Sequence, residues 1–157
     1  MRIWSIVAMA PVVLTIIGVT TMAGAVEKRI SRDDLPAVAR KTADEQARGA
    51  TVRGYSKEVE NGQLEFEVQL VTNGFTKDVS IAPDGRVLEV EEQVDMESLP
   101  GEVKFGLRTE AKKGKIRKVE SLKKGGKLVA YEAQVVTAGK RSEIQVGPNG
   151  KRLDHDE

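Results

Sequence analysis

Apolar and polar side chains alternate along residues 63–71, QLEFEVQLV. This period of two predicts an antiparallel strand with one face buried and the other face exposed. The inward positions predicted for later strands are Val79, Ile81, Ile144 and Val146. Antiparallel strands are therefore expected in both halves of the chain.

Two other segments have the spacing of helices. The positions expected on one side of each helix are Leu35, Val38, Ala39, Thr42, Ala43 and Gln46 in the first, and Leu99, Val103, Leu107 and Ala111 in the second. Pro36 and Pro100 stand near the first turns, where a missing N–H costs nothing. Gly49 and Gly114 are the predicted ends of the helices.

Two kinds of turn recur. Asn73-Gly74 and Ala138-Gly139 have the spacing of hairpin turns that need positive φ. The triplets PDG at 83–85 and PNG at 148–150 combine a fixed φ with a glycine that takes the left-handed conformation. Each triplet is expected to close the last hairpin of its half.

The flanks of these turns repeat as well. With an offset of 65 residues, FEVQLVTNGFTKDVSIAPDGRVLE lies over YEAQVVTAGKRSEIQVGPNGKRLD. A repeat of this length suits a duplicated small domain. We therefore predict an α+β fold of two tandem repeats, residues 26–94 and 95–157, each with one helix packed on a roughly four-stranded antiparallel sheet. The two sheets are expected to join or pack, and to leave their other faces open.

Residues 1–25 differ from the rest of the chain. Arg2 precedes a long apolar run that ends in Ala23-Gly24-Ala25, which is typical of a secretory signal peptide cut after Ala25. The alternative is a retained anchor, because residues 3–23 approach the ~20 residues that span a bilayer. The Ala-x-Ala ending favours cleavage, and hence a secreted or periplasmic protein without stable membrane insertion.

Composition removes several classes of function. The chain has no cysteine, which excludes disulfides, a lipid-modified N-terminal cysteine and thiolate chemistry. The segment after residue 25 has 24 basic and 24 acidic side chains, and its neutrality argues against a nucleic-acid binder.

The order of these elements resembles the PepSY-like family, in two tandem copies. The shared features are LP at the start of a helix, a glycine near its end, the strands FEVQL and YEAQV, and a final DG or NG turn. The likeness covers residues 30–157 and extends, in architecture, to the secreted beta-lactamase inhibitor protein. It implies a non-enzymatic exported module, inhibitory or chaperone-like toward a protein. No inhibitory residue can be carried over, and the disulfides usual in the inhibitor are missing here.

The inventory for catalysis is poor. His155, the only histidine, stands in the tail LDHDE, where a cation site and a solvated terminus are the alternatives. No nucleophile has a base at a recognisable spacing, and no glycine-rich phosphate loop occurs. We therefore expect neither an enzyme nor a cofactor or metal site, and an unrecognised hydrolase is the weakest alternative.

Charge is divided between the two halves. Residues 26–94 have ten basic and fourteen acidic side chains, and residues 95–157 have the reverse. In the acidic half, Glu65, Glu67, Asp78, Glu89 and Glu91 are expected on the sheet face opposite the helix. In the basic half, residues 112–127 contain eight Lys or Arg and only Glu120 as an acid. This polarity indicates either a surface that steers a charged partner or opposite signs that help the halves dock.

From these patterns we predict a surface that binds an exported protein, such as a protease. Its candidate residues are Glu65, Glu67, Gln69, Asp78, Glu132, Gln134, Tyr55 and Phe75. Tyr55 and Phe75 are exposed anchors or core residues, whereas Phe66 and Tyr131 occupy equivalent inward positions. The alternative function is an envelope sensor of a small ligand or divalent cation.

Overall fold

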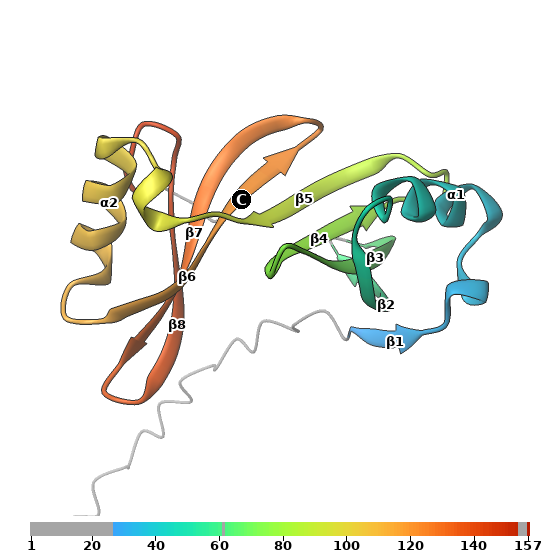
Figure 1. Cartoon of the computed structure of the whole chain (residues 1–157), viewed down its shortest axis with the longest axis horizontal. Helices are drawn as coiled ribbons and strands as arrows, with labels where there is room; N and C mark the ends of the chain where they lie inside the picture. Colours follow the sequence, from blue (N-terminus) through green and yellow to red (C-terminus); the bar gives the residue numbers. More distant parts are fainter. Residues whose placement is uncertain (1–26, 61, 154–156) are drawn as a thin grey trace, which may run out of the picture.

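The computed structural model describes residues 27–60, 62–153 and 157. Its elements are β1 (Lys28–Ile30), the short 3-10 helix η1 (Arg32–Asp34), α1 (Ala37–Gln46), β2 (Thr51–Glu60), β3 (Gln63–Thr72), β4 (Phe75–Ile81), β5 (Val87–Gln93), the 3-10 helix η2 (Met96–Ser98), α2 (Gly101–Ala111), β6 (Lys115–Lys124), β7 (Lys127–Thr137) and β8 (Lys140–Val146) (Figure 1). The predicted signal peptide with its cut after Ala25, and His155, lie outside the described residues. Within those residues, no helix has the length and apolar character needed to cross a membrane.

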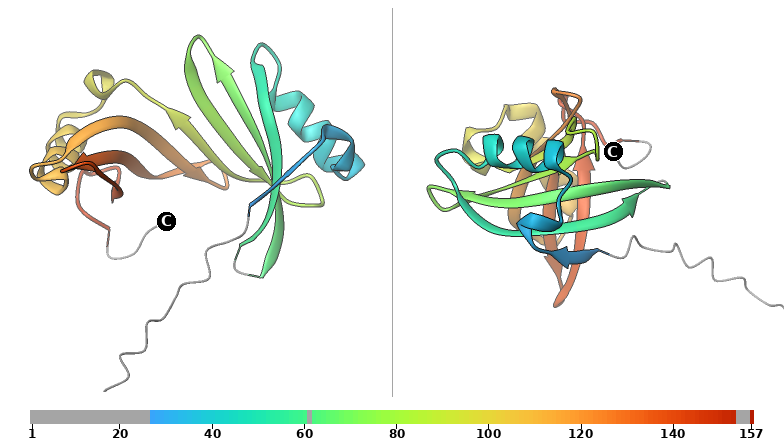
Figure 2. Two further views of the ribbon diagram at one scale, coloured as in Figure 1. Left: turned by 90° about the horizontal axis from the view of Figure 1, so that it is seen from below. Right: turned by 90° about the vertical axis from the view of Figure 1, so that its right-hand side faces the viewer.

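The strands of the described chain form one antiparallel sheet of eight strands, ordered β1 to β8 as in the sequence. The predicted α+β fold of two tandem repeats, each with one helix on a four-stranded sheet, is therefore wrong. The molecule is mostly β, and two α-helices pack on a single sheet that bends between the two ends (Figure 2).

Strand β5 is the physical reason for this difference. It pairs with β4 and also makes five cross-strand pairs with β6. Without β6, the edge of β5 that faces away from β4 would expose a row of unpaired N–H and C=O groups. Pairing with β6 satisfies these groups. The described residues of the second half contain no matching strand; after Gly150 they show a single bridge, from Arg152 back to Val146. The first turn is followed by the apolar-rich RVLEV, whereas KRLDHDE follows the second.

Each helix covers its own part of the same sheet face. One core cluster joins Leu35, Ala39 and Ala43 to Phe66, Val68, Leu70, Val79 and Ile81, and the other joins Leu99, Val103, Leu107 and Ala111 to Val119, Ala133, Val135 and Val146. The predicted inward positions of α2 are thus confirmed, as are Phe66, Val68 and Leu70 in β3, whereas Leu64 at the start of β3 is 41% exposed. Val38 was expected on the buried side of α1, but it is 56% exposed.

The repeated glycine turns are docking points for the helices. At Gly85, φ is +86°, and an added Cβ would lie 2.6 Å from Cγ1 of Val38. Thr42 in α1 donates a hydrogen bond from Oγ1 to the carbonyl oxygen of Gly85 at 2.8 Å. At Gly150, φ is +73°, and an added Cβ would overlap the carbonyl of Glu102 in α2. Both turns therefore need glycine for conformation and for space.

Opposite charges meet where the halves join. Lys124 Nζ lies 3.4 Å from Glu89 Oε2, and Lys123 Nζ lies 3.5 Å from Glu92 Oε2. Both pairs connect β6 to β5. Some of the opposite charges of the two halves thus form ion pairs across this junction. This agrees with the alternative in which opposite signs help the halves dock.

Candidate functional site

The sheet face without helices carries the acidic side chains. Along β3, Glu65, Glu67 and Gln69 alternate with the buried core residues, so they face away from α1. The register continues this row across the sheet, because Gln69 is opposite Asp78 in β4, and Asp78 is opposite Glu91 in β5. The pairing of strands therefore gathers carboxylates from separate segments. We call this surface the open face.

A cavity of about 410 Å³ lies on the open face. Its acidic lining residues are Glu58, Glu60, Glu67, Asp78, Glu89, Glu91, Glu132 and Glu157. Among the described residues that line it, none is basic. We call it the acidic cavity. Its walls come from β2, β3, β4, β5, β7 and β8 together with the C-terminal residue, so both halves of the chain contribute.

Burial and mutual repulsion disfavour charge in the acidic cavity. Burial, followed by the charges of Glu132 and Glu120, raises the pKa of Glu91 from 4.5 to about 8. Burial is also the main cause that raises the pKa of Glu67, against a hydrogen bond from Gln69 that lowers it. Near neutral pH, the folded protein therefore favours the protonated form of Glu91.

Among the described residues, Asp78, Glu91 and Glu120 form a compact group of acids. Each offers a carboxylate oxygen, and these three oxygens lie within 4.8 Å of one another. The pKa of Asp78 is raised by burial first and by Glu120 next, whereas Lys118 lowers it. Lys118 Nζ lies 2.7 Å from Oε1 of Glu120, whose side chain is only 4% exposed. The ammonium group therefore already neutralises one of the three acids.

Amide side chains hold two of the glutamates in place. Gln69 Nε2 donates to Glu67 Oε1 at 2.8 Å, and Gln145 Nε2 donates to Glu132 Oε2 at 2.9 Å. The backbone N–H of Glu157 donates to Oε1 of Gln145 at 2.8 Å. Glu157 is thus held at the rim of the acidic cavity.

The structure brings together only part of the predicted set. Glu67, Asp78 and Glu132 line the acidic cavity, whereas Gln134 lines a separate hollow on β7 and β8. Glu65 lies on the same face, where burial raises its pKa and neighbouring Glu60 adds to the effect.

The two aromatic candidates lie elsewhere. Tyr55 is partly buried and packs against the first core cluster. Phe75 is 42% exposed and lines a cavity at the junction of the halves.

Glu120 is the main residue that sequence reasoning left out of the site. In the sequence it is the single acid of a basic segment, and nothing local indicates that it is buried. Its position depends on the pairing of β6 with both β5 and β7, where it lies opposite Gln93 and Glu132. Glu89 and Glu91 were expected on the open face but were not among the candidate binding residues. The alternation of side chains along β5 was the signal that could have added them.

The sequence matches no protein-family model and no curated protein. Solved structures with a similar fold include a predicted periplasmic protein from Bacteroides eggerthii, with 17% identity, a TM-score of 0.61, and coverage of 76% of this chain and 86% of that one. A DUF2874 family protein from Bacteroides ovatus has 16% identity, a TM-score of 0.60, and coverage of 76% and 85%. A BLIP-like protein from Bacteroides fragilis has 16% identity, a TM-score of 0.55, and coverage of 74% and 81%. These likenesses establish the fold; the resemblance to the PepSY-like family stays a prediction.

Proposed function

We propose that the protein is an exported, non-enzymatic binding protein whose acidic cavity receives Lys or Arg side chains of another exported protein, which it inhibits or regulates. One observation carries this proposal. Eight carboxyl side chains line a concave surface on the sheet face that neither helix covers. Such a surface attracts cationic groups, because concave walls of one charge sign focus the field.

The raised pKa values supply an energetic argument. A carboxyl group such as Glu91, with a pKa of about 8, is held in surroundings that disfavour its charge. A cationic side chain at hydrogen-bond distance reverses this, because it stabilises the ionised form. Binding is then coupled to proton release from Glu91, and affinity increases as the pH rises from 6 to 8.

Export is part of the same proposal. The leader-like start of the chain, the expected cut after Ala25 and the absence of cysteine agree with a secreted or periplasmic protein that folds without disulfides. A structural neighbour with the same fold is described as BLIP-like, and this supports a binding role by analogy of architecture. We keep residues 26–94 and 95–157 as the two evolutionary repeats.

The test is a cross-linked capture from the native exported fraction, compared between two charge-matched variants. Glu67→Lys with Asp78→Lys reverses charge inside the acidic cavity. Glu45→Lys with Glu102→Lys makes the same change on exposed positions of the two helices. We expect one dominant exported protein that the first variant loses and the second keeps. Equal capture by both variants would contradict the proposal.

A divalent cation is the second candidate ligand. The observation that favours it is the group of three carboxylate oxygens within 4.8 Å at Asp78, Glu91 and Glu120. Oxygen ligands suit Ca²⁺, but Lys118 already occupies one side of Glu120 at 2.7 Å. A metal ion would have to displace that ammonium group, and for this reason we rank it below a protein partner.

Calorimetric titration with CaCl₂ and with ZnCl₂ separates the two candidates. The protein-partner proposal predicts only weak, unsaturated heats that 0.15 M salt removes. A saturable heat that Asp78→Asn abolishes, and that Glu45→Gln leaves unchanged, would transfer the function to the cation.

A further inference from the structure

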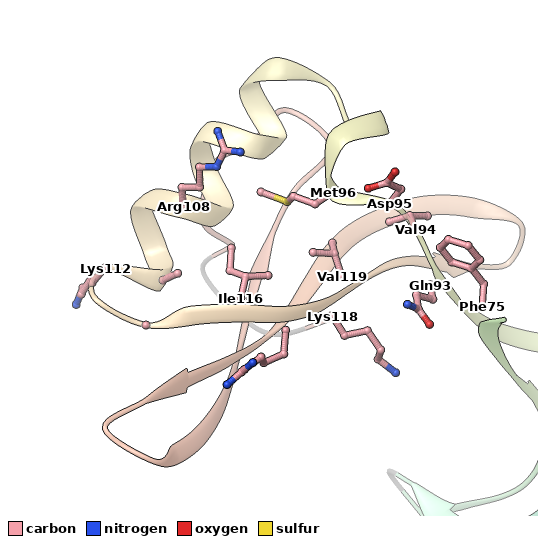
Figure 3. Close-up of a pocket in the computed structure, with 13 residues that line it drawn as sticks. Phe75, Gln93, Val94, Asp95, Met96, Arg108, Lys112, Ile116, Lys118 and Val119 are labelled. Atoms are coloured by element: carbon pink, nitrogen blue, oxygen red, sulfur yellow. The ribbon is translucent and has the colours of Figure 1, made fainter.

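A second cavity lies on the helix-bearing side of the sheet, where the two halves meet. Its volume is about 590 Å³, and it lies between α2, β6 and the loop that leaves β5. Figure 3 shows Met96 and Ile116 between the helix and the strand, with Lys112 at one end and Phe75 at the other. We call it the junction cavity. Nothing in the proposed function of the open face uses it.

The floor of the junction cavity is apolar. Val94, Met96 and Ile116 are partly buried and pack against the second core cluster, which contains Val119. At the far end, Phe75 keeps 42% of its surface exposed to solvent. A pocket of several hundred Å³ with an apolar floor and a few polar groups is the usual form of a small-molecule site.

The rim of the cavity is basic. Four cationic residues line it, Arg108, Lys112, Arg117 and Lys118, against the single acid Asp95. Asp95 accepts a hydrogen bond from the backbone N–H of Glu97 at 3.0 Å, so it serves as the cap of η2.

Two of these cations lack a carboxylate. Arg108 pairs with Glu97 at 3.3 Å and Lys118 with Glu120 at 2.7 Å. Within residues 27–60, 62–153 and 157, no ion pair is formed by Lys112 or Arg117. The rim therefore retains positive charge that an anion could neutralise.

Lys112 also has an unusual backbone. It ends α2 with φ of 51° and ψ of −111°, where glycine would be free of strain. Holding a residue with a side chain in this rare conformation destabilises the folded chain locally. The strain falls on Lys112, a residue that lines one end of the cavity (Figure 3).

We propose that the junction cavity binds a small amphipathic anion, a carboxylate attached to an unbranched apolar body such as a medium-chain fatty acid. The apolar body lies along Met96, Ile116 and Phe75, where it displaces water from apolar surface. The carboxylate lies against Lys112 and Arg117. The open face on the other side of the sheet is acidic and repels an anionic ligand. Charge therefore directs the ligand to the junction cavity.

The test is calorimetric titration of the purified protein with decanoate, with decyltrimethylammonium as the probe of equal chain length and opposite charge. We expect one saturable site for decanoate and none of comparable affinity for the cation at this cavity. Lys112→Glu with Arg117→Glu should weaken decanoate binding by about tenfold or more, as the loss of two charge-assisted contacts implies.

The matched control is Lys113→Glu with Lys115→Glu. It makes the same charge change in the same segment, at exposed residues that do not line the cavity. This control should bind decanoate as the unchanged protein does, and Phe75→Ala should weaken binding about fivefold through lost apolar contact.

Absence of a saturable decanoate heat would overturn the proposal. Equal weakening by the control pair and by the Lys112→Glu, Arg117→Glu pair would also overturn it, because the effect would then be general charge. Neither result would contradict the function proposed for the acidic cavity, because capture of a cationic partner depends on Glu67 and Asp78 on the other face.

Discussion

Carboxyl groups on the open face are brought together by strand pairing, and their charges repel one another. Glu91 has the largest shift among the described acids, because it is partly buried and lies near the charges of Glu132 and Glu120. Its pKa of about 8 means that the folded protein holds this proton more tightly than the unfolded chain, where the pKa is near 4.5. A group of this kind makes the stability of the fold depend on pH.

The first prediction is that stability falls as the pH rises through neutrality. The contribution of Glu91 is full below pH 4.5 and is lost as the pH approaches 8. Glu91→Gln keeps the shape and removes the charge, so it should increase the free energy of unfolding at pH 8 by about 1–3 kcal/mol, allowing for partial exposure to solvent. Urea unfolding at pH 5, 7 and 9 measures this difference.

Glu92→Gln is the control for this experiment. Glu92 follows Glu91 in β5, points to the other face and pairs with Lys123 at 3.5 Å. Its replacement should leave the pH dependence unchanged. If Glu91→Gln showed the same pH dependence as the unchanged protein, repulsion at Glu91 would not be a feature of the fold.

For single residues, the alternation of apolar and polar positions predicted the location of some members of the open face but not of others. Glu65, Glu67 and Gln69 share a strand with buried apolar residues, so the period of two placed them on the open face. The burial of Glu120 comes from neighbours in β5 and β7, which no local pattern contains. The ammonium group of Lys118, close to Glu120, follows from the same pairing.

Elements dock through close approach of backbone. Helix α2 lies on the turn after β8, where Gly106 and Gly150 allow the helix and the turn to touch. The sequence predicted the turn conformation at Gly150, because proline, asparagine and glycine favour it. The sequence did not predict the contact between Gly150 and α2. The positive φ of the turn was already a sufficient reason for glycine at this position.

The second prediction concerns that contact. Gly150→Ala adds a Cβ that overlaps the carbonyl oxygen of Glu102, in addition to the strain of positive φ. We expect a loss of about 2–4 kcal/mol in the free energy of unfolding. Gly139→Ala has a φ of +81° with open space around it, and should cost only about 1 kcal/mol.

The difference between the two variants isolates helix docking from backbone strain. Urea midpoints measured side by side give this difference directly. Equal losses would mean that α2 moves away from the turn at no cost, and would remove Gly150 as a docking residue.

The repeat also predicted a final strand in each half, and the part of the second half that the structure describes contains no such strand. The turn 83–85 is followed by β5, whereas the turn 148–150 is followed by one bridge at Arg152. Repetition of a turn does not supply the apolar residues that a new strand must bury.

For the whole molecule, the central question is how two cores share one sheet. Each helix and its strands form a separate apolar cluster, and the connection between them is the pairing of β5 with β6. Hydrophobic periodicity identifies strands and their buried faces, but it does not state which strand lies beside which. The sequence therefore predicted most of the strands and left two alternatives for the two sheets, joining or packing. The pairing of β5 with β6 shows that they join.

The third prediction tests the charges at this connection. Lys123→Glu with Lys124→Glu places like charges next to Glu92 and Glu89, and should lower the free energy of unfolding by about 1–2 kcal/mol at low salt. Adding Glu89→Lys and Glu92→Lys exchanges the two signs and should restore most of the loss. Urea unfolding in 10 mM and 500 mM NaCl should show the difference shrinking with salt.

The control is again Lys113→Glu with Lys115→Glu, which removes the same charge from the basic half away from β5. If this control destabilised the protein as much as the change at Lys123 and Lys124, long-range attraction between the oppositely charged halves would explain the loss of stability. If only the junction pair mattered and the exchange restored stability, contacts across β5 and β6 would hold the halves together. The remaining charge of each face would then be free to select its ligand, a cation on the open face and an anion at the junction.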